Sequence, residues 1–218
     1  MAMNQPFTTA SPINAVYNFT DVAEGTGVIS LYLCRTTDSV GDDFILTSNS
    51  LKSADEARGS NRASAGSEAN PTQDLDDDYD LTAFNSSRTI EGTATLNIPY
   101  VIGTSASSNT RTGYLIVKIR KWDGATETEI ASVQSETVSQ AAGTEEGVFL
   151  MQVDVPRTHF SRGETLRITM EVWTQVAGSG TTASLAYGTD PADRDFTWNS
   201  ATFESTQSQI NIPLQLDL

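Results

Sequence analysis

The sequence predicts an all-β protein, folded as an antiparallel β-sandwich of jelly-roll type, and two observations carry this prediction. Apolar and polar residues alternate with a period of two along most of the chain, and helical periodicity is almost absent. Turn-forming glycines, prolines and aspartates separate the alternating runs at regular intervals. About eight or nine such strands fit a jelly roll better than a seven-stranded immunoglobulin domain.

The clearest alternation lies in residues 164–173, where Leu166, Ile168 and Met170 share one face and charged or hydroxyl side chains share the other. Further strands are expected at residues 27–36, 43–47, 88–103, 112–122, 147–155, 184–188 and 209–218. The pair Asp123-Gly124 predicts a tight hairpin turn that leads into an edge strand over residues 126–138. Pro156 is expected to end one strand, and Gly163 to precede the next.

The chain has 218 residues, a length that one β-rich domain accommodates. We expect an N-terminal arm over residues 1–27 and a single β-sandwich domain over residues 28–218. Residues 47–80 break the alternation and contain few large apolar side chains, so burial there cannot offset the entropy of ordering them. They are predicted to form a long polar loop inserted into the domain.

The charge is strongly negative: 13 Lys and Arg against 28 Asp and Glu give a net charge of −15. Such a surface repels phosphate backbones, so we expect no direct nucleic-acid partner. The N-terminus lacks the pattern of a signal peptide, and no apolar stretch reaches membrane-spanning length. We therefore expect a soluble product of the cytoplasm that does not bind membranes.

An acidic run, "QDLDDDYD", raises the question of a metal site. Its aspartates are Asp74, Asp76, Asp77, Asp78 and Asp80. The run lacks the glycine and the final glutamate of an EF-hand loop, although a few of its carboxylates could still bind calcium. We favour the simpler interpretation, a solvated flank where the polar loop rejoins the sandwich, and assign no metal-binding residue.

No catalytic pattern stands out. His159 is the single histidine, so sites with several histidines are excluded, and its place between Pro156 and Gly163 is typical of an ordinary turn residue. Cys34 is the single cysteine and is expected to be a buried small hydrophobe. The chain has no G-x-S-x-G, P-loop or C-x-x-C motif. We assign no catalytic and no cofactor-binding residue. A pair of carboxylates distant in sequence would leave no local signature, so that class of enzyme stays a third hypothesis.

The tryptophans are the remaining candidates for binding. Trp122 and Trp173 each end an expected strand, and Trp198 lies in an expected loop. Exposed aromatic rings could stack against sugars or fill a protein–protein interface. Packing at the edge of the core is the favoured interpretation of each one taken singly.

Three stretches resemble a known group of proteins: "YNFTDVAEGTGVISLYLC" (17–34), "VFLMQVDVPRTHFSRGETLRITMEVW" (148–173) and "LAYGTDPADRDF" (185–196). Together they resemble structural proteins of tailed bacterial and archaeal viruses, which are thought to be jelly-roll components of the virion. The resemblance implies a capsid-associated, decoration or vertex role and brings no catalytic residues. The residues themselves predict a loop clasp in the third stretch, with Asp190 accepting backbone N–H groups and Arg194 pairing with Asp190, Asp193 or Asp195.

These observations lead to the prediction of a non-enzymatic structural component of a virus particle, with no cofactor. It is expected to contact copies of itself and other capsid proteins, to form a homo-oligomer, and to reside in the virion after synthesis in the host cytoplasm. The alternative is a carbohydrate- or receptor-binding β-sandwich module with a surface glycan as ligand. The sequence leaves the position in the particle, the symmetry and the host open.

Overall fold

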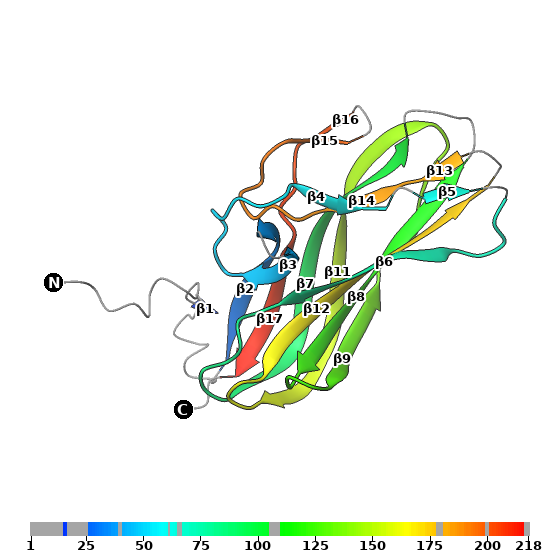
Figure 1. Ribbon diagram of the computed structural model, residues 1–218. Helices are drawn as coiled ribbons and strands as arrows, with labels where there is room; N and C mark the ends of the chain where they lie inside the picture. Colours follow the sequence, from blue (N-terminus) through cyan, green and yellow to red (C-terminus); the bar gives the residue numbers. More distant parts are fainter. Residues whose placement is uncertain are drawn as a thin grey trace.

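The computed structural model describes residues 15–16, 26–38, 41–60, 62–64, 67–104, 110–177, 181–198 and 201–215. These residues form an all-β structure without a helix, and Figure 1 shows its long strands running side by side. Within this part of the chain, no helix is present that could cross a membrane.

The strands of the first half are β1 (Ala15–Val16), β2 (Thr26–Asp38), β3 (Gly41–Thr47), β4 (Ala57–Gly59), β5 (Arg62–Ser64), β6 (Thr72–Asp80), β7 (Arg88–Thr104) and β8 (Arg111–Trp122). The strands of the second half are β9 (Glu127–Gln134), β10 (Val138–Gln140), β11 (Gly143–Phe160), β12 (Thr165–Val176), β13 (Thr181–Ala183), β14 (Leu185–Gly188), β15 (Phe196–Trp198), β16 (Ala201–Phe203) and β17 (Gln209–Gln215).

Thirteen of these strands belong to one mixed sheet with the order β10-β8-β12-β6-β3-β2-β17-β7-β14-β4. β1, β9 and β11 are attached to it beside β2, β8 and β7. Pairing is antiparallel except where β3 meets β6, at Ile45 and Asp80. The sheet bends there, so that β2, β17, β7 and β11 lie opposite β6, β12, β8 and β9 (Figure 1).

The main apolar core fills the space between these two halves. One half contributes inward-facing residues such as Leu31, Ile98 and Ile212, and the other contributes residues such as Val117 and Ile168; all five are at most 1% exposed. Every second residue of each long strand points inward, because side chains alternate between the faces of a sheet. The predicted inward face of residues 164–173 is therefore confirmed, as are the strands expected at residues 112–122 and 88–103.

The predicted hairpin at Asp123-Gly124 is also confirmed, and it joins β8 to β9. Gly124 has a φ of +96°, which glycine adopts without strain. The Asp123 carboxylate accepts hydrogen bonds from the backbone N–H groups of Ala125 and Thr126, at 2.8 and 2.7 Å. These bonds lower the pKa of Asp123.

The stretch 47–80 differs from the expected polar loop, because it contains β4, β5 and the long strand β6. β6 pairs with β12 along most of its length and buries Tyr79 completely. The strand at β11 is also longer than expected: Pro156 lies inside it, at a shift of register between Val155 and Thr158. A proline is tolerated there because the irregular ladder does not need its missing N–H.

The expected N-terminal arm lies mostly outside the described residues. Ala15 and Val16 are the exception, and they pair with Ile29 and Val28 of β2.

Candidate protein-binding face

The acidic run is a strand rather than a solvated flank, so its carboxylates divide between the two faces of β6. Asp77 lies on the inner face and is 7% exposed. It accepts a two-pronged ion pair from Arg58, at 2.8 and 3.0 Å, and a hydrogen bond from the Tyr187 hydroxyl at 3.2 Å. The hydroxyls of Tyr187 and Tyr79 meet at 3.0 Å. Burial raises the pKa of both tyrosines, so both stay protonated.

Asp74 has its own set of partners near the start of β6. Its carboxylate binds the Arg62 guanidinium at 2.6 Å and accepts hydrogen bonds from the hydroxyls of Ser60 and Thr174. Among the described residues, no group of three or more histidine, cysteine, aspartate or glutamate side chains is placed to hold a metal ion. Alternation along the strand and pairing with arginine explain this arrangement of the aspartates.

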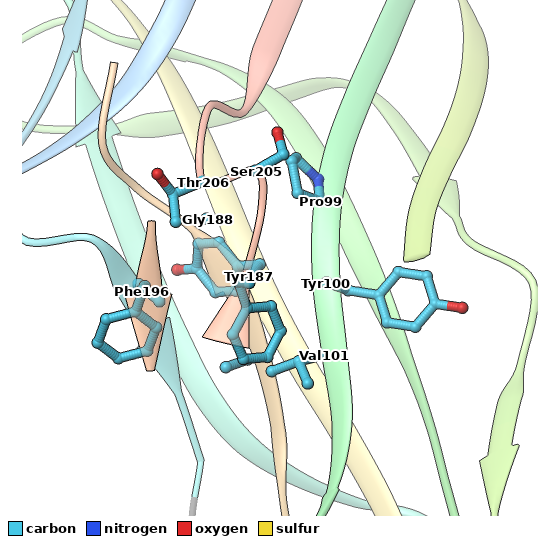
Figure 2. Close-up of a pocket in the computed structure, with 11 residues that line it drawn as sticks. Pro99, Tyr100, Val101, Tyr187, Gly188, Phe196, Ser205 and Thr206 are labelled. Carbon is cyan, nitrogen blue, oxygen red and sulfur yellow. The ribbon is translucent and has the colours of Figure 1, made fainter. Parts of the chain in front are cut away.

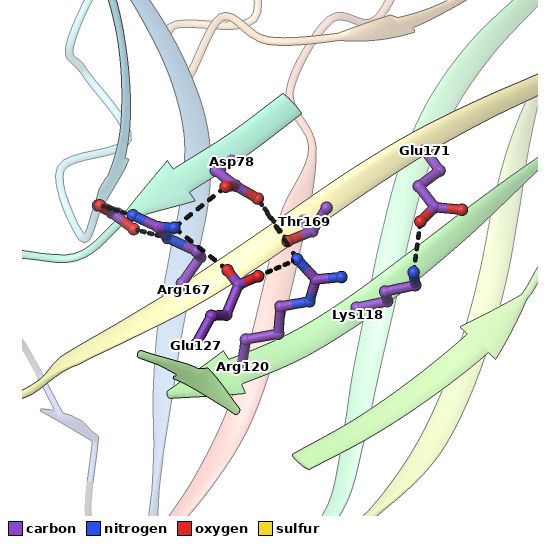
Figure 3. A network of polar contacts seen from close by, with 8 residues as sticks. Asp78, Lys118, Arg120, Glu127, Arg167, Thr169 and Glu171 are labelled. Carbon is purple, nitrogen blue, oxygen red and sulfur yellow. Dashed lines mark hydrogen bonds and ion pairs between the residues drawn. The ribbon is translucent and has the colours of Figure 1, made fainter. Parts of the chain in front are cut away.

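The outer side of β6, β12, β8 and β9 carries a network of ion pairs, which we call the charged face (Figure 3). Arg167 binds Asp80 with Nε and Nη2, at 2.6 and 2.8 Å, and its Nη1 reaches Asp78 and Glu127, both at 3.1 Å. Arg120 binds the same Glu127 at 2.5 Å. Cations and carboxylates thus alternate across neighbouring strands, which favours each pair and orders the long side chains.

The charged face extends to Glu171, which pairs with Lys118 (Figure 3). Asp76 lies directly opposite Glu171 in the β6–β12 ladder. Burial, the charge of Glu171 and the charge of Asp78 raise the pKa of Asp76. The like charges at this point of the network therefore oppose the ionisation of Asp76.

Two of the three tryptophans lie on the charged face. The Trp122 ring packs against the Arg167 guanidinium, 4.8 Å from the ring centroid. Trp173 stacks on Tyr114 with 6.2 Å between ring centroids and donates a hydrogen bond to Glu171 at 2.8 Å. Both rings are engaged by neighbours, which agrees with the favoured interpretation of edge packing. The side chain of Trp198 lies outside the described residues.

His159 and Cys34, the other candidates that the sequence offered, lie in ordinary structural surroundings. His159 is exposed on β11, with Nδ1 3.4 Å from the Thr89 hydroxyl. Cys34 is a buried free thiol, and burial raises its pKa to about 11, which disfavours the reactive thiolate. Neither the sequence pattern nor these positions assign a catalytic role to either side chain.

The predicted clasp at Asp190 and Arg194 is present and reaches further than expected. Asp190 is fully buried, accepts the Arg194 Nε–H at 2.7 Å and accepts the backbone N–H groups of Ala54 and Ala192. Arg194 also binds Glu56 at 3.0 Å. The clasp therefore ties the segment after β14 to the segment before β4.

A small pocket lies where β7 and β14 meet the β15–β16 hairpin (Figure 2). Val101, Ala186 and Phe203 form a minor apolar cluster there, and Phe196 packs against it. The internal space is about 10 Å³, which is room for about one water molecule. This pocket is a packing seam between the hairpin and the sheet, too small for a ligand.

The outer side of β11, β7, β17 and β2 differs in chemistry over its middle part and forms our candidate site. We call it the uncharged face, after the two central rows of side chains described next. Two rows of side chains cross its strands in register. The first row is Leu150, Asn97, Gln209 and Tyr32, and the second is Gln152, Thr95, Asn211 and Ser30. Neither row contains a charged residue. Within them, Asn211 accepts from Ser30 at 2.7 Å and donates to Thr95 at 3.2 Å.

Exposed apolar side chains gather on the uncharged face. The described residues include four exposed large apolar side chains, and Val28, Val148 and Leu150 lie here at 44%, 44% and 78% exposure; Leu51 is the fourth. An open hollow of about 500 Å³ lies beside Leu150, which contributes to its lining; the other lining residues are Thr95, Leu96, Asn97, Met151, Gln152 and Asn211. A second hollow of about 230 Å³ lies beside Val148.

Sequence reasoning missed both faces as surfaces, although the uncharged face contains one readable signal. The outward residues of 147–155 include Val148 and Leu150 among polar neighbours, which breaks the alternation expected for a strand with one wet face. The amide and hydroxyl residues of the other strands lie far apart in sequence. Only strand order and register bring them together.

The comparisons with known proteins gave structural neighbours only. No family model matches the chain, and no curated protein matches it. An α-amino acid ester hydrolase is 9% identical with a TM-score of 0.48, and the match covers 84% of this chain and 36% of the hydrolase. A CocE/NonD family hydrolase from Staphylococcus aureus is 12% identical with a TM-score of 0.41, covering 84% and 41%. An infectious bursal disease virus structure is 14% identical with a TM-score of 0.31, covering 92% and 51%.

These comparisons contradict the prediction of a non-enzymatic structural component of a virus particle, and with it the prediction that the chain is not an enzyme. Hydrolases and an aminopeptidase, not virion proteins, are the neighbours with the higher TM-scores among them. The alternative of a carbohydrate- or receptor-binding module is withdrawn as well. The inference failed because strand patterning specifies a fold that hosts many functions.

The same neighbours do not supply an activity. Their TM-scores lie below 0.5, and the chain spans 36–41% of the length of these enzymes. No hydrolase chemistry is therefore carried over to this chain. With no matching family model, membership of the tailed-virus protein group stays a prediction.

Proposed function

We propose that this chain acts as a protein-docking domain whose uncharged face binds an uncharged protein surface. One observation carries the proposal: three of the four exposed large apolar side chains of the described residues lie on this face, in a chain of net charge −15. The cores of protein interfaces are depleted in charged residues and enriched in buried apolar anchors. The uncharged face has this composition, whereas the charged face does not.

Leu150 is the principal anchor of the proposed contact. It is 78% exposed, and burial of a leucine side chain contributes about 1.5–3 kcal/mol. The exposed amides of Asn97 and Gln152 flank it and offer both donors and acceptors to a partner backbone or amide. A small ligand in the open hollow beside Leu150 would keep much of its surface in water, so a broad protein surface is the better fit.

We also infer that the two halves of the sheet form a β-sandwich of jelly-roll type with eight principal strands. The supporting observation is the pairing order, β2–β17–β7–β11 in one half and β6–β12–β8–β9 in the other. In the first half, β17 from the end of the chain lies between β2 and β7. Such insertion of late strands between early ones is typical of two interlocked Greek keys.

Site-specific photo-crosslinking tests the docking proposal. A photoreactive amino acid replaces Gln152 on the uncharged face or, as the matched control, the exposed Glu129 on β9. After irradiation in cells that produce the chain, mass spectrometry identifies the crosslinked peptide. We expect a defined protein adduct from position 152 that disappears when Leu150→Lys is added, and little adduct from position 129. Absence of an adduct at position 152, or equal adducts at both positions, contradicts the proposal.

A further inference from the structure

We infer that the partner docked on the uncharged face is a second copy of this chain, related to the first by a twofold axis. This inference rests on the proposed function and adds the identity of the partner. Three properties of the face carry it: the lack of charge in its two central rows in an acidic protein, the placement of Leu150 beside a hollow, and the carboxylates at its ends.

The charge of the whole chain limits where two copies can meet. Each copy carries a net charge of −15, so most approaches bring like charges together and are repelled. The two rows across β11, β7, β17 and β2 contain amides, hydroxyls, a tyrosine and a leucine only. Contact through these rows buries no charge, and therefore avoids the large cost of desolvating an unpaired carboxylate.

The uncharged face is also complementary to itself. In a twofold contact the same patch is used on both sides, so each copy must supply a projection and a matching recess. Leu150 projects at 78% exposure, and the hollow of about 500 Å³ lies directly beside it. Each leucine can enter the hollow of the other copy. Asn97 and Gln152 carry donors and acceptors in one group, so each amide can pair with its own image.

The charges at the two ends of the uncharged face predict how salt changes the association of two copies. Along the outer side of β11, the sequence runs Glu146, Val148, Leu150, Gln152 and Asp154, so a carboxylate stands at each end of the apolar and amide segment. Both carboxylates are exposed. Two copies bring such carboxylates near one another, and salt screens the repulsion. Association through this face therefore strengthens as the salt concentration rises, whereas an interface of ion pairs weakens.

Sedimentation velocity on the full chain tests the inference at low salt and at about 1 M NaCl. We expect a monomer–dimer equilibrium that shifts toward dimer at high salt. Leu150→Lys is expected to raise the dimer Kd at least about tenfold, as loss of an interface anchor does. The matched control Leu51→Lys changes an 85% exposed leucine away from this face and should leave the Kd unchanged. Far-UV circular dichroism establishes that both variants fold.

The outcomes separate this inference from the proposed function. A chain that stays monomeric at high concentration in both salts, or a dimer whose Kd is unaffected by Leu150→Lys, overturns the second copy as partner. A position-152 adduct with a different protein then leaves the docking function standing. A monomer that also gives no adduct at position 152 removes both. A dimer that weakens with salt contradicts the contact proposed here.

Discussion

The charged face and the uncharged face are built from the same kind of strand, yet their outward residues differ in the contacts that they make. On the charged face, Arg167 and Arg120 each meet carboxylates from neighbouring strands. On the uncharged face, Asn211 joins Ser30 and Thr95 through neutral hydrogen bonds. On the first surface, Arg167 and Arg120 pair with carboxylates of the same chain. The second leaves Leu150 and its neighbours available for an external contact.

Net charge alone does not identify the surface through which an acidic protein binds a partner. The face with more charged residues has partners for many of them within the chain. The uncharged face, whose two central rows contain no charged residue, holds three of the four exposed large apolar side chains among the described residues. Perturbing each face, and the buried layer beneath the charged one, should give effects of different size and different salt dependence.

The largest effect is expected beneath the charged face, at Asp77. Asp77→Ala leaves Arg58 without its partner and removes an acceptor from Tyr187, so we expect a loss of about 3 kcal/mol in the free energy of unfolding. The control Asp78→Ala removes a side chain that is 37% exposed and should cost about 1 kcal/mol or less. Chemical denaturation measures both. Equal losses would show that the two sides of β6 do not differ energetically.

A smaller effect, with a distinct dependence on salt, is expected when each face loses one central side chain. Arg167→Ala removes contacts to Asp80, Asp78 and Glu127 and should cost about 1–2 kcal/mol at low salt, with a smaller loss at about 1 M salt. Asn211→Ala removes neutral hydrogen bonds and should cost about 1 kcal/mol at either salt concentration. Denaturation at two salt concentrations measures the contrast. A salt-sensitive loss of stability in Asn211→Ala would contradict the expected difference in salt dependence between the two faces.

The smallest effect concerns Asp76, whose pKa is raised by burial and by the charges of Glu171 and Asp78. A carboxyl group with a higher pKa in the folded state destabilises the fold when ionised. This penalty is absent below the unfolded pKa and grows as the pH rises toward the folded value. Asp76→Asn should therefore raise the Tm at neutral pH by at most about 4 °C. The gain should vanish below about pH 3.

Thermal unfolding followed by circular dichroism across this pH range measures the Asp76→Asn difference. A lower Tm at neutral pH would mean that attraction to Lys118 and Arg120 outweighs the repulsion from Glu171.

Prediction from sequence succeeded where a short local pattern of residues determined the structure. Alternation located β12, β8 and β7, and Asp123-Gly124 located the β8–β9 turn. Prediction failed at β6, because the sequence alone does not distinguish an inward, paired aspartate from a solvated one. Those partners, Arg58 and Tyr187, lie 19 and 110 residues away in sequence. No window of sequence around Asp77 contains the information that it is paired.

The sequence by itself determined the all-β class, the inward sides of the longest strands and the acidic character of the chain, because each depends on local pattern or on a sum over residues. The tertiary structure decided which strands became neighbours, and hence which polar groups met. That choice placed Asp74, Asp77, Asp78 and Asp80 of β6 beside arginines. It also gathered Leu150, Gln152, Thr95 and Asn211 on one face. Contacts between residues distant in sequence are set by strand order and register, which a period of two residues does not encode.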